Sequence, residues 1–159
     1  MGSHRYYGQS PLQLKLIYWT VTDNQWNSFI EVSDTTVADG SLTLKNNGKP
    51  VLTSINTWTD TVKTHYDAYF IDQVGSGTTE KEFISEDAMA PSLGVDADNR
   101  IYLVLCEKKD AHLYELVCYT RTGSTWERTI IAQSTSGFWM NKLLRSDPYL
   151  FLITCQNLS

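Results

Sequence analysis

Three segments of this chain repeat one pattern, and that repeat constrains the fold more than any other feature of the sequence. Residues 39–55, 90–106 and 141–154 align with one another and make Leu42, Leu93 and Leu143 equivalent, at spacings of 51 and 50 residues. Each copy contains a short strand pattern, a polar turn and a second strand pattern, and the turn residues are those of hairpins. The turns lie at 46–48, 96–99 and 146–148. The pattern therefore indicates a repeated structural unit.

A second hairpin pattern repeats between these segments. Residues 14–32 align with 114–132 at a shift of 100, which superposes Trp26 on Trp126, and a middle copy runs from Tyr66 to Ser85. The turns of these copies lie at 22–24, 75–77 and 122–124. Apolar and polar residues alternate through the runs as they do in strands, and no helical periodicity interrupts them. Each unit is therefore predicted to be four antiparallel strands in an all-β chain.

The order of the hairpins predicts how the units are divided along the chain. Residues 1–10 start with Met-Gly-Ser-His and read as a tag remnant or N-terminal segment. The chain then has half a unit at 12–33, complete units at 39–85 and 90–133, and half a unit at 141–156. Four strands in about forty to fifty residues is the pattern of a β-propeller blade. We therefore expect residues 11–159 to form three propeller blades.

Three blades do not close into a ring, and an open stack exposes a strand edge at each end. Head-to-tail pairing of two chains would complete the first half-unit of one chain with the last half-unit of the other. The sequence thus predicts a six-bladed β-propeller formed by a homodimer. A fragment of a longer propeller is one alternative, and another all-β fold, such as a twelve-stranded sandwich, is a second.

Two stretches of the second complete unit carry a family resemblance. Residues 91–105, Pro-Ser-Leu-Gly-Val-Asp-Ala-Asp-Asn-Arg-Ile-Tyr-Leu-Val-Leu, are like an S-L-x-x-D-x-x-G-x-P-x-x-x-Y strand pair, and residues 119–126, Tyr-Thr-Arg-Thr-Gly-Ser-Thr-Trp, are like an S-x-D-x-G-x-T-W Asp box. On these residues the chain resembles the BNR/Asp-box-like propeller repeats of sialidase-like and fucose-lectin-like proteins. Arg121 stands where the box has Asp. The resemblance implies a propeller fold, and since such repeats occur in enzymes, lectins and adaptors it does not choose among them.

Charge and composition limit the classes of partner. The net charge of −5 over 159 residues argues against nucleic acid and anionic membrane, because phosphate binding requires clustered Lys and Arg. The chain has no apolar run of about eighteen residues and no apolar leader, so we expect it to be soluble. A signal peptide could have been removed, which leaves the compartment unassigned. The cysteines Cys106, Cys118 and Cys155 lack metal-ligand spacing, so no metal or other cofactor is expected. Each is predicted to be a small buried strand residue, with a disulfide as the alternative.

The longer loops are the predicted binding face. In a propeller, the loops between blades and between the second and third strands share one face, while the tight turns share the other. Aromatic residues in such loops suit stacking on a sugar ring, and nearby carboxylates would accept hydrogen bonds from its hydroxyls. The candidate ligand-binding residues on this basis are Trp58, Asp60, Asp87, Asp110, Phe138 and Trp139.

Catalysis is less well supported by the sequence than binding. Sialidase-like chemistry, which the resemblance would imply, needs an Arg cluster that grips a substrate carboxylate and a Tyr nucleophile. The arginines do not supply it, because Arg100, Arg121 and Arg145 map to the tight-turn side and Arg128 lies within a strand. The sequence therefore favours a non-catalytic module that binds a glycan or docks a protein. A sialidase-like or other glycoside hydrolase, with loop acids such as Glu86, is the alternative.

Overall fold

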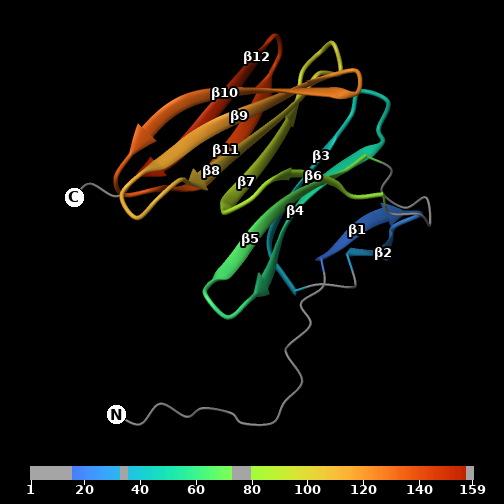
Figure 1. Cartoon of the computed structure of the whole chain (residues 1–159). Coiled ribbons are helices and arrows are strands. Elements are labelled where there is room, and N and C mark those ends of the chain that lie inside the picture. The colour runs from blue at the N-terminus through green and yellow to red at the C-terminus, as the bar shows by residue number, and fades with distance from the viewer. Residues whose placement is uncertain (1–15, 33–35, 73–79, 157–159) are drawn as a thin grey trace, which may run out of the picture.

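The computed structural model of the chain describes residues 16–32, 36–72 and 80–156, and every regular element in them is a β-strand (Figure 1). The strands are β1 (Leu16–Thr22), β2 (Gln25–Val32), β3 (Thr36–Leu44), β4 (Pro50–Thr59), β5 (Thr64–Ile71), β6 (Glu82–Ser85), β7 (Ala88–Val95), β8 (Ile101–Lys108), β9 (Tyr114–Thr122), β10 (Thr125–Ser134), β11 (Phe138–Ser146) and β12 (Tyr149–Gln156). The predicted all-β class is confirmed. Within these ranges no helix is present that is long and apolar enough to cross a membrane.

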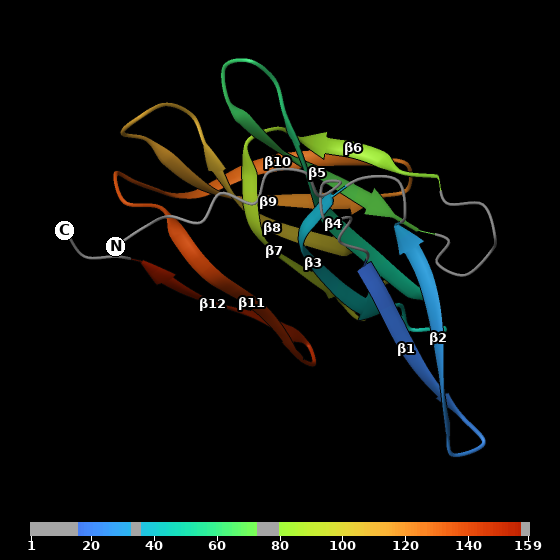
Figure 2. The ribbon, with the colours of Figure 1, turned by 90° about the horizontal axis from the view of Figure 1, so that it is seen from below.

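The strands form four antiparallel sheets, each a run of neighbours in the sequence. They are an N-terminal hairpin (β1–β2), a first sheet (β3–β4–β5–β6), a second sheet (β7–β8–β9–β10) and a C-terminal hairpin (β11–β12). Seen from below, the two hairpins lie on opposite sides of the four-stranded sheets (Figure 2). The described strands of this single chain do not close into a ring or barrel.

Tight turns join the strands where the sequence places turn residues. Asp23 and Asn24 both have positive φ, as a two-residue hairpin turn requires, and Asn99, Gly48 and Gly123 supply the left-handed residue of three further turns. The predicted turn at 75–77 lies outside the described residues.

Backbone pairing has the same register at the positions that the sequence alignment makes equivalent. The aligned leucines each lie opposite another leucine: Leu42 opposite Leu52, Leu93 opposite Leu103, and Leu143 opposite Leu152. A bulge interrupts the start of β3, β7 and β11. A second bulge leaves out Glu31 in β2 and Ile131, 100 residues later, in β10. Bulges set the local bend of a strand, so these strand pairs bend at equivalent points.

The core lies between successive sheets. We call the face of each sheet that carries Leu42, Leu93 or Leu143 its leucine face, and the other its opposite face. Val51, Ile55 and Phe70 on the opposite face of the first sheet pack against the leucine face of the second. The opposite face of the second sheet, with Val104 and Cys106, packs against the leucine face of the C-terminal hairpin. One mode of packing therefore occurs twice within the chain.

Matching hydrogen bonds accompany the two contacts. The backbone N–H of Leu93 donates to Ser41 Oγ at 3.0 Å, and the backbone N–H of Leu143 donates to Ser92 Oγ at 2.8 Å. Ser41 and Ser92 are equivalent in the alignment, as are their partners. The innermost strands β3, β7 and β11 are thus linked in the same way at both contacts.

Two expectations about single residues need correction. Cys155 is exposed, whereas Cys106 is buried and Cys118 half-buried, and all three are free thiols. The reason is that Cys155 lies on the opposite face of the C-terminal hairpin, and none of the described sheets covers that face. Trp58, Phe138 and Trp139, expected in loops, lie at the ends of strands β4 and β11, because strand pairing continues to those positions.

Leu103→Ala should destabilise the chain by about 3 kcal/mol, because the side chain is fully buried between the two four-stranded sheets and its removal leaves a cavity. Urea unfolding followed by circular dichroism measures the change. The control is Ile130→Ala, whose side chain on β10 is exposed and whose loss should cost less than about 1 kcal/mol. Equal losses for both variants would contradict a core between the sheets.

Candidate functional site

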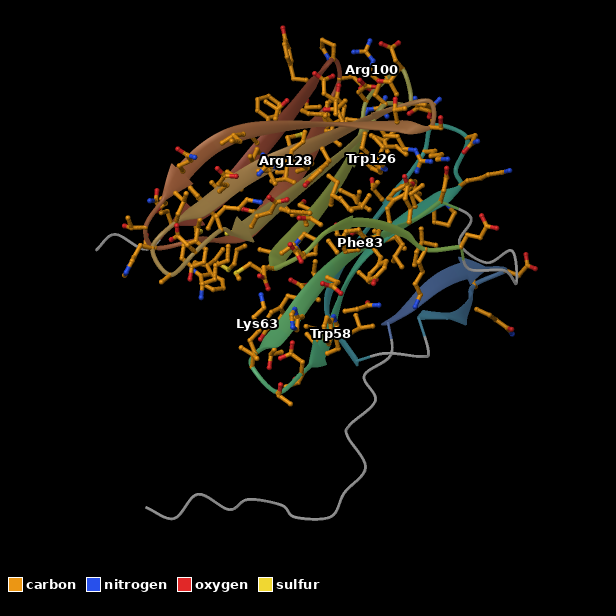
Figure 3. All side chains as sticks on the ribbon, in the orientation of Figure 1. Trp58, Lys63, Phe83, Arg100, Trp126 and Arg128 are labelled. Atoms are coloured by element: carbon orange, nitrogen blue, oxygen red, sulfur yellow. The ribbon has the colours of Figure 1, made fainter. Side chains whose placement is uncertain are left out.

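An open groove of about 510 Å³ lies at the β4–β5 and β8–β9 turns and at the beginnings of β7 and β11. Figure 3 shows that Lys63 is at this end of the molecule and Arg100, in a tight turn, at the other. The groove is lined by residues from both four-stranded sheets and from the C-terminal hairpin: Lys63, Thr64, Tyr66, Asp87, Met89, Lys108, Lys109, Asp110, Tyr114 and Trp139. Three of the residues predicted from the sequence, Asp87, Asp110 and Trp139, are therefore brought together.

Trp139 presents an exposed aromatic surface to the groove. Its side chain is 42% exposed, near the start of β11. The residue before this strand, Gly137, has φ of +74°, and a Cβ built there would lie 3.5 Å from ring atoms of both Trp139 and Tyr114. The backbone of Gly137 thus runs between the two rings. Its positive φ turns the chain into β11, which sets where Trp139 projects.

Asp87 is held at the groove wall by its own backbone and by a lysine. Its carbonyl accepts a hydrogen bond from the Lys108 N–H at 2.9 Å, across the β7–β8 pair. Its carboxylate forms an ion pair with Lys63 Nζ at 2.6 Å, and this interaction raises the pKa of Lys63. Asp87 is one of few non-glycine residues with positive φ, at 51°. The carboxylate is therefore fixed in position, with lone pairs left to accept further hydrogen bonds.

Lys108 and Asp110 offer charged groups on the other side of the groove. Lys108 Nζ lies 6.0 Å from the centre of the Tyr114 ring, and among the described residues no carboxylate lies within ion-pair distance of it. Asp110 Oδ1 accepts the backbone N–H of His112 at 2.7 Å, which orders the loop between β8 and β9. One cation and one carboxylate oxygen thus remain available to a ligand.

Trp58 and Asp60 belong to a separate cluster outside the residues that line the groove. The Trp58 ring stacks on His65 with centroids 3.7 Å apart, and its Nε1–H donates to Asp67 at 2.7 Å. Asp60 bonds to His65 Nε2 at 2.8 Å. Hydrogen bonds from the backbone of Lys63, from His65 and from the backbone N–H of residue 62 hold the pKa of Asp60 well below its usual range. Both side chains are engaged within the β4–β5 hairpin.

Phe138 is 3% exposed and packs against Val104, Cys106 and Leu116 under the start of the C-terminal hairpin. Its backbone N–H also contacts the Cys106 sulfur at 3.3 Å. Because successive side chains of a strand point to opposite faces, Phe138 of β11 points toward the second sheet and Trp139 points away from it. The position therefore supports packing of the hairpin rather than a ligand contact.

A buried charge network lies beneath the groove and was not foreseen from the sequence. Glu107 is fully buried on the leucine face of the second sheet, and it accepts hydrogen bonds from Ser85 and Tyr119, both at 2.6 Å. Its other oxygen pairs with Arg128 at 2.7 Å and with Lys109, a groove residue, at 2.5 Å. The network therefore joins the first sheet, the second sheet and the floor of the groove.

The environment of Glu107 stabilises its ionised form. Burial alone would raise the pKa of this carboxyl, but the hydrogen bonds from Lys109, Ser85, Tyr119 and Arg128 outweigh that effect and lower the pKa to about 2. Arg128 also pairs with Glu115, and the hydrogen bond from Arg128 lowers the pKa of Glu115. Every oxygen of Glu107 is occupied, so the network holds the sheets together and is not free to act on a substrate.

Several groove residues lay close to the sequence prediction without being chosen. Lys63, Met89, Lys108 and Lys109 fall within the loops predicted to form the binding face, but lysines in loops are common and gave no separate signal. Tyr114 is at the start of a strand, where the sequence pattern predicts a side chain that packs within the sheet rather than one that contacts a ligand. Which of many polar loop residues meet at one place is decided by the packing of sheets far apart in the sequence.

The groove suits recognition of a polar ligand with a flat apolar face. An exposed indole, a phenol, fixed carboxylates and a free ammonium group provide stacking, acceptor and donor functions side by side. In the part of the chain that the structure describes, no group of three or more His, Cys, Asp or Glu residues is arranged to hold a metal ion.

Comparison of the chain with protein-family models, with curated proteins and with solved structures finds no match.

Stability should fall as the pH is lowered from about 5 to 2, because Glu107 has a lower pKa in the folded chain than in the unfolded chain. The stabilisation is complete above the unfolded pKa of 4.5 and is lost as the pH falls towards the folded value of about 2. It amounts to about 3 kcal/mol. Urea unfolding over this pH range measures it. Glu107→Gln should flatten the pH dependence, and an unchanged pH profile in this variant would contradict the role of Glu107.

Proposed function

We propose that this chain is a non-catalytic binding module that takes a sugar in the groove between Trp139, Asp87 and Asp110. The single observation behind the proposal is the exposed Trp139 ring beside fixed carboxylates in one groove. A sugar ring has an apolar face of C–H groups that stacks on an indole, while its equatorial hydroxyls reach acceptors at the rim. Asp87 is already oriented by Lys63 and by the backbone, so it loses little freedom on binding.

The charge of the groove narrows the class of sugar. Three lysines and two aspartates line it, in a chain whose net charge is −5. Lys63 is paired with Asp87 and Lys109 with Glu107, which leaves Lys108 as the available cation. Lys108 would favour a sugar that carries a carboxylate or sulfate group. A glycan is therefore preferred here over a protein segment as the ligand.

We also propose that the sheets are propeller blades of the BNR/Asp-box-like kind and that two chains complete one six-bladed ring. The support is the equal register of equivalent strand pairs, with bulges at equivalent positions, and the single packing mode that occurs twice. Each half-unit has two strands where the other sheets have four. A second copy supplies the two strands that each half-unit lacks.

A hydrolase is disfavoured by how the charged residues are used. Arg128 is committed to Glu107 and Glu115, and Arg121 stacks on Phe70 and Trp126 in the core. No arginine is among the residues that line the groove. Asp87, one of the acids that a glycosidase would use, is ion-paired and so is poorly suited to donate a proton.

Trp139→Ala should weaken binding to the best ligand on a glycan array by roughly thirtyfold, because truncation of a central stacking Trp costs about 2 kcal/mol. Titration calorimetry with that ligand gives the constant. Trp58→Ala is the matched control, because Trp58 is similarly exposed but engaged with His65 and Asp67 outside the residues that line the groove. It should bind like the unmodified chain.

The opposite result, loss of binding in Trp58→Ala alone, would move the site to the β4–β5 hairpin. Turnover of an aryl glycoside that is abolished by Glu86→Gln or Asp87→Asn would overturn the non-catalytic proposal. Absence of any glycan ligand on an array that includes neutral, carboxylated and sulfated sugars would overturn sugar recognition.

Light scattering of the purified chain should give twice the 18.1 kDa chain mass over the micromolar range. We expect a dimer because each copy leaves a strand edge and an apolar sheet face uncovered, and a second copy would bury both. A mass of 18.1 kDa at all concentrations would overturn the proposed dimer without affecting the proposed sugar site.

A further inference from the structure

One packing rule governs the contacts within the chain. The leucine face of the second sheet covers the opposite face of the first sheet, and the leucine face of the C-terminal hairpin covers the opposite face of the second. Among the described residues, two surfaces are left without a complete cover. They are the part of the leucine face of the first sheet around Leu42 and Leu44, and the opposite face of the C-terminal hairpin. Elsewhere on the leucine face of the first sheet, Leu52 and Ile71 are buried.

The exposure of equivalent side chains shows that both faces are unfinished. On the leucine faces, Leu93 is 4% exposed but its equivalent Leu42 is 42% exposed. On the opposite faces, Val104 is 1% exposed but its equivalent Ile153 is 54% exposed. Phe151 and Tyr149 lie on the same uncovered face of the C-terminal hairpin and are also exposed. Large apolar side chains that stay in contact with water do not stabilise a fold, and patches of them mark interaction surfaces. These two faces are therefore suited to being covered by another surface.

A groove beside β12 indicates that the uncovered surface of the C-terminal hairpin would accept a further β-strand. It has a volume of about 300 Å³ and is lined by Cys118 and Ile131 of the second sheet and by Leu150 and Leu152 of β12. Among the described strands, β12 pairs only with β11, so its outer edge is open at this groove. In the second sheet, the corresponding edge of β8 is paired with β9. The groove is thus mostly apolar and lies beside the free edge of β12, where a third strand would run.

We propose that a second copy of this chain covers these surfaces, with its β1 paired antiparallel to β12 and its first sheet packed over the C-terminal hairpin. This inference rests on the proposed dimer and specifies its interface. Leu42 and Leu44 of one copy then pack on Phe151 and Ile153 of the other. The contact repeats the rule that already joins the sheets of one chain.

The register of the new strand pair follows from the second sheet. There Leu103 lies opposite Tyr119, and Cys106 lies opposite Leu116. The equivalents on β12 are Leu152 and Cys155, and the equivalents on β1, 100 residues before β9, are Trp19 and Leu16. Leu152 of one copy is therefore opposite Trp19 of the other, and Cys155 is opposite Leu16.

Cysteine cross-linking tests the register directly, because a disulfide forms only when the two Cα atoms are within about 7 Å. Leu16→Cys should be oxidised to a covalent dimer with the native Cys155, seen at twice the 18.1 kDa mass on a non-reducing gel. Thr20→Cys is the matched control, since it lies on the same strand about 13 Å from the position opposite Cys155. It should remain uncross-linked, as should Leu16→Cys combined with Cys155→Ser.

A second pair checks the same register from another point. Thr20→Cys combined with Phe151→Cys, in a Cys155→Ser background, should cross-link, because residues 20 and 151 are also opposite in the inferred register. A dimer by light scattering in which neither pair cross-links, or in which Thr20→Cys joins Cys155, overturns this interface but leaves the proposed dimer standing. A monomer without cross-links overturns both, while glycan binding by Trp139 is measured independently.

Discussion

Successive sheets of this chain hold one another in place through a single kind of contact, in which a leucine face covers the opposite face of the sheet before it. The contact between the two four-stranded sheets buries Val51, Leu103 and Val117 completely. At about 25 cal/mol per Å² of apolar area, such burial is the main favourable term available, because the described residues form no helices and no disulfides. The positions of the turns, the loops and the groove follow from how the sheets are stacked.

The groove depends on the same contact. Its residues come from three sheets, and Lys109 at its floor is held by Glu107, which also bonds to Ser85 of the first sheet. A shift between the sheets would therefore break a buried charge network as well as an apolar core. Removing one partner of such a network is costly, because it leaves an unpaired charge in the interior. The proposed binding surface is consequently built on a rigid support, which suits recognition of a small polar ligand.

Much of the local structure could be predicted from the sequence, and particular residues show where prediction stopped. The hairpin turns at Asp23 and Gly48 follow from residues that tolerate positive φ. Phe138 and Trp139 are adjacent aromatic residues, yet Phe138 is buried and Trp139 is exposed. The reason is that the pairing register of β11 alone decides which of the two side chains faces the second sheet. Cys155 looked like Cys106 in its local sequence and differs from it because none of the residues that the structure describes covers its face.

The sequence by itself determined the all-β class and the spacing of its strands, since alternation and turn chemistry are local properties of the chain. Only the tertiary structure decided that Lys63, Asp87, Lys108 and Trp139 meet in one groove and that Glu107 is a buried anion among cations. The physical reason is that these relations depend on the stacking of sheets whose contacting residues are far apart along the chain. No local pattern encodes the distance between two side chains that meet only when separate sheets pack.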